Sequence, residues 1–444
     1  MEQRPSYSQI WNISIPIILS LLAQNIIGLT DTAFLSQVGE TELGASAVGS
    51  IYFFVLFMLG FGFTTGTQIL IARRNGEKNY KAIGPLMENC WYLLIVGAVI
   101  IVSLSPYISP FIFKSMDGTP AIHDAAIEFT NIRVFGLPFA FIMASFRAFH
   151  VGTTNSKVLT FSSITMAVVN IFLDYAMIFG NFGFPEMGLQ GAAIASVIAE
   201  FSAATFLVIY NLNKNNRLKY RLFCFKEVDF KLIKEMFSLS IYIMILYFIS
   251  NSTWLIFFLI IGQMGERSLA ISGIIRSLYS LFMLPIWGFT STTSSLVSNV
   301  IGAGRTDYVI PTIKRMCRIG FITSTILSFI LIVFGQNLLS LFSKDDITLV
   351  TDALPSLYVI AFSNIVFGVS AIIFNGIAGT GRTKVAMIIE LSTLVIYMSY
   401  AFLMVRLFSH QVAFAWTSEI IYWTIAGLIS IWYLRTGKWR GVQI

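Results

Sequence analysis

The chain of 444 residues is 56% hydrophobic and only 11% charged, with a mean hydropathy of +0.78, whereas about a quarter of the residues are charged in an ordinary soluble domain. This composition excludes a soluble body that carries one or two membrane anchors, because the soluble part would lower the average. The formal net charge of +7 is explained by the Lys and Arg that cytoplasmic loops of membrane proteins accumulate.

Apolar runs bounded by charges and by Gly or Pro predict twelve transmembrane helices. Continuous runs, rather than alternation, exclude a β-barrel. The predicted fold class is therefore an all-α polytopic membrane protein. The spans are 12–35, 44–71, 88–113, 128–150, 158–180, 188–211, 236–262, 268–300, 316–342, 350–378, 384–408 and 411–434.

The basic residues predict the orientation. Most of the 29 Lys and Arg residues fall in the segments that share a side with the N-terminus, and only Lys114, Arg267, Lys344 and Arg406 fall in the opposite loops. We therefore expect a multi-pass protein of the cytoplasmic (inner) membrane with both termini in the cytoplasm. The basic segment 212–235 is interpreted as a cytoplasmic linker and not as a nucleic-acid site.

The first predicted helix carries Pro16, Gln24, Asn25 and Asp31. Asp31 lies ~28 Å from the cytoplasmic end at the rise of an α-helix. Because proline removes one backbone hydrogen bond, a bend at Pro16 could move Asp31, which makes Pro16 a candidate gating residue.

The fifth and sixth predicted helices add further polar groups. Asp174 lies ~24 Å along the fifth helix, at a depth similar to that of Asp31. Asn170 is one turn away on the same face, and Ser196 and Glu200 follow on the sixth helix.

These residues predict an oxygen-rich site in the N-terminal half, with Arg133 as the one basic candidate nearby. Crowded carboxylates in a medium of low dielectric favour an H⁺ or a hard cation such as Na⁺. If the ion is Na⁺, we expect Asp31, Asn170 and Asp174 to be its ligands. In the structural alternative, Asp31 caps its helix and Asp174 faces an external vestibule.

From the seventh helix onward the chain repeats its first half at an offset of about 226 residues. Gln37-Val38-Gly39-Glu40 matches Gln263-Met264-Gly265-Glu266, and Gly62-Phe63-Thr64 matches Gly288-Phe289-Thr290. Six spans per half predict a parallel repeat, with two lobes around a central cavity. The predicted domains are the lobe 1–211, the linker 212–235 and the lobe 236–444.

The second lobe lacks the counterparts of the first lobe's acids, since Asp31 maps onto Phe257 and Asp174 onto Ala401. We therefore expect ion coupling to be concentrated in the N-terminal lobe. Arg276 and Glu419 lie at similar depth and could pair, and Glu390 is interpreted as a solvated helix end.

The chain resembles the multidrug and toxic compound extrusion (MATE) transporters. The likeness covers the whole length and rests on these features: Pro16 with Asp31, Gln68-Ile69-Leu70-Ile71-Ala72-Arg73, Asn170-Ile171-Phe172-Leu173-Asp174, Gly188 through Ser196, Leu284-Pro285 and Gly302-Ala303-Gly304.

The resemblance implies an antiporter that expels organic, often cationic, compounds in exchange for Na⁺ or H⁺. It implies that Asp31 is the coupling acid and that Asn170 and Asp174 are its partners, while Ser196 stands where the family usually has Thr. Family acids of the second lobe fall here on Ser250 and Asn364. Asn364 and Arg276 are therefore kept as candidates for a cavity in that lobe.

The main alternative is a flippase for lipid-linked saccharides or lipids, for which Arg276 would be a candidate phosphate contact. An enzyme is not expected, because no HExxH motif and no metal cluster occur in the sequence. We expect no cofactor, no nucleic-acid partner, a lipid bilayer and small organic cations as partners, and a monomer. The choice between Na⁺ and H⁺ stays open.

Overall fold

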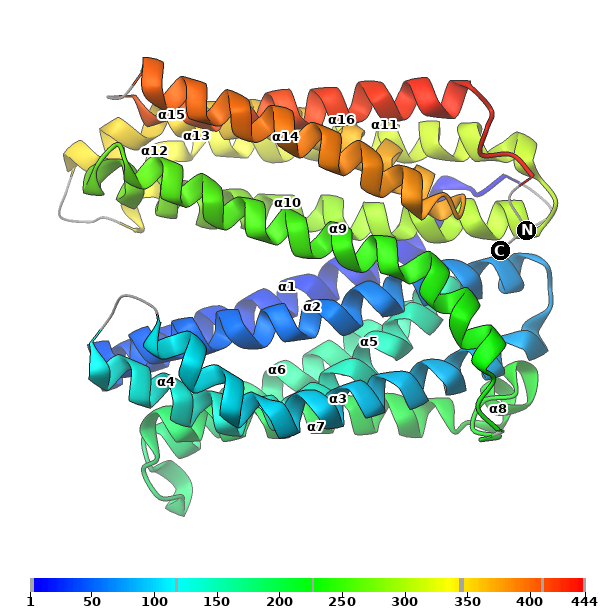
Figure 1. The fold of residues 1–444 in the computed structure, drawn as a ribbon, viewed down its shortest axis with the longest axis horizontal. Helices are drawn as coiled ribbons and strands as arrows, with labels where there is room; N and C mark the ends of the chain where they lie inside the picture. The colour runs from blue at the N-terminus through cyan, green and yellow to red at the C-terminus, as the bar shows by residue number, and fades with distance from the viewer. Residues whose placement is uncertain (1–3, 116–118, 226, 343–346, 409–410, 442–444) are drawn as a thin grey trace. The chain divides into compact units, whose positions relative to one another are not determined.

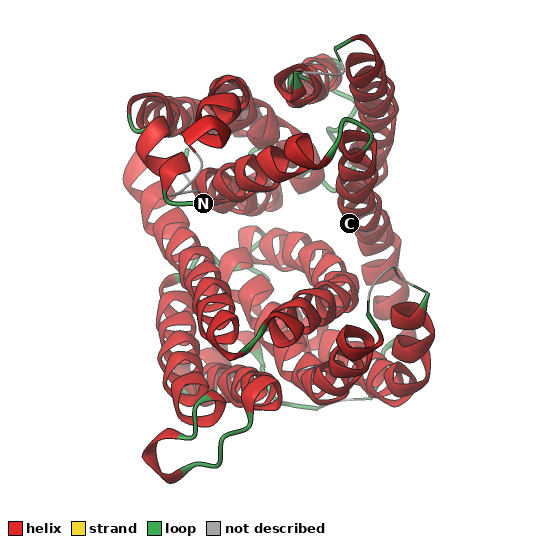
Figure 2. Cartoon of the chain, turned by 90° about the vertical axis from the view of Figure 1, so that its left-hand side faces the viewer, coloured by secondary structure: helices red, strands yellow, loops and turns green. Residues whose placement is uncertain are grey.

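The computed structural model describes residues 4–115, 119–225, 227–342, 347–408 and 411–441, and the regular structure in these ranges is helical (Figure 2). Twelve helical segments are long and apolar enough to cross a membrane, which confirms the predicted fold class. The segments are Tyr7–Val38, Glu40–Gly76, Tyr80–Lys114, Pro120–Gly152, Lys157–Ile178, Gly188–Asn211, Phe230–Gly262, Glu266–Gly302, Thr306–Val333, Thr348–Gly379, Thr383–Leu407 and Val412–Arg435.

Most helices extend beyond their predicted spans, because hydropathy detects only the apolar middle of a helix. The second helix starts at Glu40 and keeps Arg73 and Arg74 in its last turn, where charges of these signs favour the helix dipole. The predicted ninth span, 316–342, is wrong at its end. The helix stops at Val333, and Gly335–Ser340 forms a separate short helix.

One compact unit comprises Ile15–Met244. In it α6 packs along α7, and α2 packs against α4 and α5 (Figure 1). Its helices are α1 (Tyr7–Val38), α2 (Glu40–Gly76), α3 (Ile83–Lys114), α4 (Pro120–Arg133), α5 (Leu137–Gly152), α6 (Lys157–Ile178), α7 (Gly188–Asn211) and α8 (Lys214–Tyr220), with 3-10 turns at Tyr80–Ala82, Val134–Gly136 and Asn181–Gly183.

The fourth span of this unit is two helices. The 3-10 turn Val134–Gly136 separates α4 from α5, and Pro138 lies in the first turn of α5, where a missing N–H costs nothing. The predicted span 128–150 missed the first turns of α4 because His123 and Asp124 interrupt the apolar run. Arg133 is consequently the last residue of α4, directly before the turn.

The other compact unit comprises Met1–Ser14 and Ile245–Ile444. In it α13 packs against α10, α11 and α16. Its helices are α9 (Phe230–Gly262, from Ile245), α10 (Glu266–Gly302), α11 (Val309–Val333), α12 (Gly335–Ser340), α13 (Ile347–Gly379), α14 (Thr383–Leu407), α15 (Val412–Trp416) and α16 (Ser418–Arg435), with a 3-10 turn at Thr306–Tyr308.

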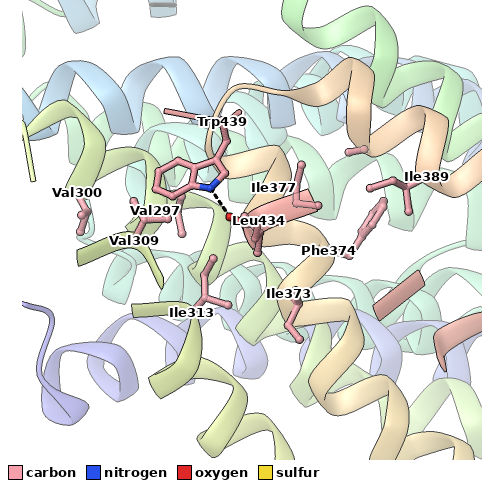
Figure 3. Close-up of a cluster of buried hydrophobic side chains, with 11 residues drawn as sticks. Val297, Val300, Val309, Ile313, Ile373, Phe374, Ile377, Ile389, Leu434 and Trp439 are labelled. Atoms are coloured by element: carbon pink, nitrogen blue, oxygen red, sulfur yellow. Dashed lines mark hydrogen bonds between the residues drawn. The ribbon is translucent and has the colours of Figure 1, made fainter. Parts of the chain in front are cut away.

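A cluster of buried apolar side chains ties the elements of this second unit together (Figure 3). Val297 of α10, Ile313 of α11, Ile377 of α13 and Ile389 of α14 belong to it. Trp439, beyond α16, is almost fully buried in the cluster, and its Nε1 donates a 2.9 Å hydrogen bond to the Leu434 carbonyl. The segment after the last span is thus packed into the unit.

Two helices contribute residues to both units. The first turns of α1 group with one unit and the rest of α1 with the other, and α9 divides between Met244 and Ile245. The predicted domain boundaries at 211, 212–235 and 236 stay a prediction.

Candidate functional site

The helices α1 and α6 bring the two predicted acids together. Asn170 and Asp174 lie one turn apart on α6 and are almost completely buried, while Asp31 of α1 is half-buried. The Asp31 carboxyl lies within interaction range of the Asp174 carboxyl, which the Asn170 amide also approaches. Sequence reasoning therefore selected three groups that form one cluster.

The polar atoms of this cluster are not satisfied by the protein. Among the described residues, no hydrogen-bond partner of normal geometry is found for Asp31 Oδ1, for both carboxylate oxygens of Asp174 or for either polar atom of the Asn170 amide. A buried polar atom left without a partner costs about 1–3 kcal/mol, and more when it is charged. A proton or a cation bound between the two carboxyl groups would relieve this cost.

The seam between α1 and α6 continues from this cluster to Pro16. Thr160 Oγ1 donates to the Pro16 carbonyl (3.3 Å), and Ser20 Oγ lies 2.5 Å from Ser163 Oγ. α1 runs through Pro16 as one continuous helix. These bonds hold α6 beside the proline and, about three to four turns further on, beside Asp31.

Glu200, the third predicted acid, forms an ion pair with Arg133. Its two carboxylate oxygens accept hydrogen bonds from both terminal nitrogens of Arg133, at 2.8 and 2.6 Å. The guanidinium also lies over the Phe53 ring, 3.7 Å from its centroid. This bidentate geometry is typical of a strong ion pair. The positive charge of Arg133 also interacts electrostatically with Asp31 and Asp174.

Two glycines permit close contacts around the site, because a side chain at either position would overlap a neighbouring group. A Cβ at Gly191 of α7 would lie 2.8 Å from the backbone oxygen of Met177 on α6. A Cβ at Gly136, in the 3-10 turn after α4, would overlap Glu200 Oε2 and Arg133 Nη1. The bare backbone at Gly136 therefore leaves the space in which the Arg133–Glu200 pair lies.

Three further predicted residues do not take part in the hydrogen bonding of the cluster. Gln24 is exposed, and Asn25 and Ser196 are half-buried. Among the described residues, none of the three makes a hydrogen bond to Asp31, Asn170 or Asp174. A sodium site here would have to use amide or hydroxyl oxygens beside the two carboxylates, because no group of three or more His, Cys, Asp or Glu suited to a metal is present in the described part of the chain.

In the second unit, Arg276 and Glu419 do not pair. The Arg276 guanidinium lies over the rings of Trp254 and Phe258, 5.7 and 5.2 Å from their centroids. Glu419 Oε2 accepts from Tyr279 Oη (3.2 Å). Asn364 is fully buried, and its Nδ2 bonds weakly to Ser324 O and Ser328 Oγ, 3.5 and 3.4 Å away.

Glu390 corrects the sequence-based interpretation. It is only 4% exposed, so it is not a solvated helix end. Its Oε1 accepts hydrogen bonds from Ser250 Oγ and Tyr422 Oη. Ser250 of α9 and Tyr422 of α16 cover this carboxylate from neighbouring helices, which hydropathy along one helix cannot detect.

Comparisons with known proteins agree on one family. The MatE family model matches residues 16–176 and 237–403. A probable multidrug resistance protein NorM of Thermotoga maritima is 26% identical over 96% of this chain and 92% of its own length. The probable multidrug resistance protein YoeA of Bacillus subtilis is 25% identical over 86% of this chain and 84% of its own length.

Solved structures share the fold. An outward-facing multidrug resistance MATE family transporter of the MOP superfamily superposes with a TM-score of 0.90 at 18% identity, over 99% of this chain and 98% of that one. A MOP superfamily transporter of Pyrococcus furiosus, described as having a binding pocket of reverse polarity that suggests a different function, gives 0.91 at 17% identity over the same shares.

Proposed function

The chain belongs to the MatE family of multidrug efflux transporters and is a multi-pass membrane protein, and we propose that it exports organic cations in exchange for H⁺ or Na⁺. The coupling ion binds at Asp31 and Asp174 with Asn170 beside them. This proposal includes both termini in the cytoplasm, a monomer, and the division into lobes 1–211 and 236–444 joined by 212–235.

One observation carries the proposal: two carboxyl groups approach each other in a transmembrane bundle, while Asp31 Oδ1 and both oxygens of Asp174 have no hydrogen-bond partner of normal geometry among the described residues. Ionisable groups at such a depth are expensive and mark ion pathways. A purely structural acid would be expected to have a donor or a basic partner, as Glu200 has in Arg133. This contrast supports a binding role for Asp31 and Asp174.

The Arg133–Glu200 pair has a positioning role in this proposal. It brings a positive charge near the acid cluster and balances it with a carboxylate. The cluster then keeps two carboxyl groups whose charge is not cancelled by a direct partner. One bound proton or sodium ion reduces that charge and weakens the attraction for an organic cation.

Exchange follows if the two ligands favour different conformations, because a ligand shifts an equilibrium only through its differential affinity. The coupling ion would reach Asp31 and Asp174 from outside and displace the organic cation. Its release to the cytoplasm would restore the negative charge. Pro16 gives α1 a point at which its backbone can bend between the two states.

Efflux of a fluorescent organic cation, measured in inverted vesicles under an imposed Na⁺ or pH gradient, tests the proposal. We expect Asp31→Asn and Asp174→Asn to abolish gradient-driven transport, since an amide cannot take up a proton or balance the charge of a cation. Asp307→Asn is the matched control, because Asp307 is exposed and pairs with Arg305. Full ion-driven efflux by Asp31→Asn would refute the coupling assignment.

A further inference from the structure

Glu390 of α14 and Glu419 of α16 lie in the second unit, where no coupling acid was expected. Each is only 4% exposed. Oε1 of Glu390 accepts from Ser250 Oγ at 2.5 Å and from Tyr422 Oη at 2.6 Å. Tyr422 lies less than one turn after Glu419 on α16, and the two glutamates also act on each other electrostatically. They form one buried pair of acids.

Neutral donors surround this pair. Tyr279 Oη of α10 bonds both to Glu419 Oε2 and to Ser363 Oγ of α13, at 3.2 Å each. Tyr397 of α14 also approaches Glu419. In the described ranges, no Lys, Arg or His forms an ion pair with either glutamate, and Arg276, three residues before Tyr279, stacks on Trp254 and Phe258 instead.

An unused donor points into the pair. Trp423 is 7% exposed, and its Nε1 lies within interaction range of Glu419 and Tyr279 but makes no hydrogen bond of normal geometry with a described residue. The indole is held between the rings of Phe367 and Tyr422, each 4.6 Å away between centroids. A fixed N–H beside a carboxyl group without a completed bond suits a neutral acid, because an ionised carboxylate would attract the donor.

We propose that Glu390 and Glu419 form a second proton-binding site, separate from Asp31 and Asp174, which is loaded and unloaded during transport. When the Glu419 carboxyl group loses its proton to water, the resulting carboxylate accepts a hydrogen bond from Trp423 Nε1. The bound species is a proton rather than an organic cation, since Tyr397 and Tyr422 are buried and their rings pack against each other and against Phe257 and Trp423.

This inference rests on the proposed antiport for its role in transport, but the proton site can be measured without transport. The test uses the full-length protein in lipid and records infrared difference spectra between low and high pH in the carbonyl stretch of protonated carboxyl groups. We expect Glu390→Gln and Glu419→Gln each to remove part of this signal. Glu128→Gln, at an exposed glutamate of the first unit, should leave it unchanged.

Trp423→Phe keeps the ring and removes only the N–H. Because the ionised acid then loses a donor, we expect the pair to bind its proton several-fold more tightly, so that the signal changes at higher pH. This variant tests the proposal even if a Gln variant does not fold. The proposal is overturned if the folded Gln variants keep the whole signal, or if Trp423→Phe does not move its midpoint.

The two proposals can fail separately. If Asp31→Asn and Asp174→Asn still transport but the Glu390 and Glu419 signal is present, the N-terminal coupling site is wrong and the second proton site stands. If efflux by Glu419→Gln keeps the pH dependence of the parent protein, the pair has no role in the cycle. A loss of coupling in Asp31→Asn together with an intact Glu419 signal supports both.

Discussion

Asp174 and Glu200 show how differently two buried carboxylates can be used. Glu200 forms a bidentate ion pair with Arg133, whereas neither carboxylate oxygen of Asp174 has a hydrogen-bond donor of normal geometry among the described residues. The arrangement at Glu200 is typical of a structural ion pair, whereas the arrangement at Asp174 is suited to a site that binds and releases a ligand. The sequence identified both as acids in apolar helices, but it could not tell which of them Arg133 would reach.

Arg133→Gln is expected to destabilise the protein strongly. Removing one partner of a buried pair leaves the Glu200 charge uncompensated, which costs about 3–5 kcal/mol. Thermal denaturation in detergent should show a large fall in midpoint. The double variant Arg133→Gln with Glu200→Gln should recover most of the loss. If the double variant were as unstable as the single one, the unpaired charge would not be the cause.

Gly136→Ala should disturb the same pair without changing a charge. Its Cβ would overlap Glu200 Oε2 and Arg133 Nη1, so we expect a lower denaturation midpoint and weaker transport. Gly97→Ala is the matched control, because the space around a Cβ at Gly97, within helix α3, is open. Alanine there should be neutral or stabilising by up to about 1 kcal/mol. Equal effects of the two substitutions would contradict this explanation.

At the scale of elements, the linker after α8 is fixed to α3. Glu88 Oε1 accepts from the backbone N–H groups of Cys224 (2.6 Å) and Phe225 (3.0 Å). Arg221, Phe223 and Phe225 all have positive φ, a backbone conformation that costs energy for residues other than glycine. The carboxylate of Glu88 helps to hold this strained segment. The basic segment 212–235 is therefore partly folded rather than an extended connection.

Glu88→Ala should release the linker. Without its acceptor, the 221–225 backbone is expected to relax, and trypsin should cleave at the neighbouring Lys and Arg residues several-fold faster. Glu227→Ala removes an exposed glutamate close by and serves as the control. Cleavage rates that do not differ between the two variants would show that Glu88 does not hold the segment.

At the scale of the molecule, the proposed orientation places this linker in the cytoplasm. Cys224 is exposed, whereas Cys90 is buried and Cys317 is partly buried. We therefore expect a membrane-impermeant maleimide to label the protein in inverted vesicles and not in intact cells. Cys224→Ser should remove the label. Labelling of Cys224 in intact cells would reverse the orientation predicted from the Lys and Arg distribution.

The sequence by itself determined the twelve spans and the family, and it selected Asp31, Asn170 and Asp174 as candidate site residues. A transmembrane span is recognised from the hydropathy and the length of one segment, so the residues of each helix are sufficient to predict it. The errors of the sequence-based spans have the same origin: His123 and Asp124 interrupt the apolar run and hid the start of α4, and the apolar residues past Val333 concealed the end of α11.

Only the tertiary structure decided which charged groups meet. The Arg133–Glu200 pair, the separation of Arg276 from Glu419, and the burial of Glu390 under Ser250 and Tyr422 each involve side chains on different helices. Depth along a helix follows from residue number, but the rotation of each helix and its distance from its neighbours depend on packing. Close approaches such as those at Gly136 and Gly191 set these quantities, and they are not encoded in any one span.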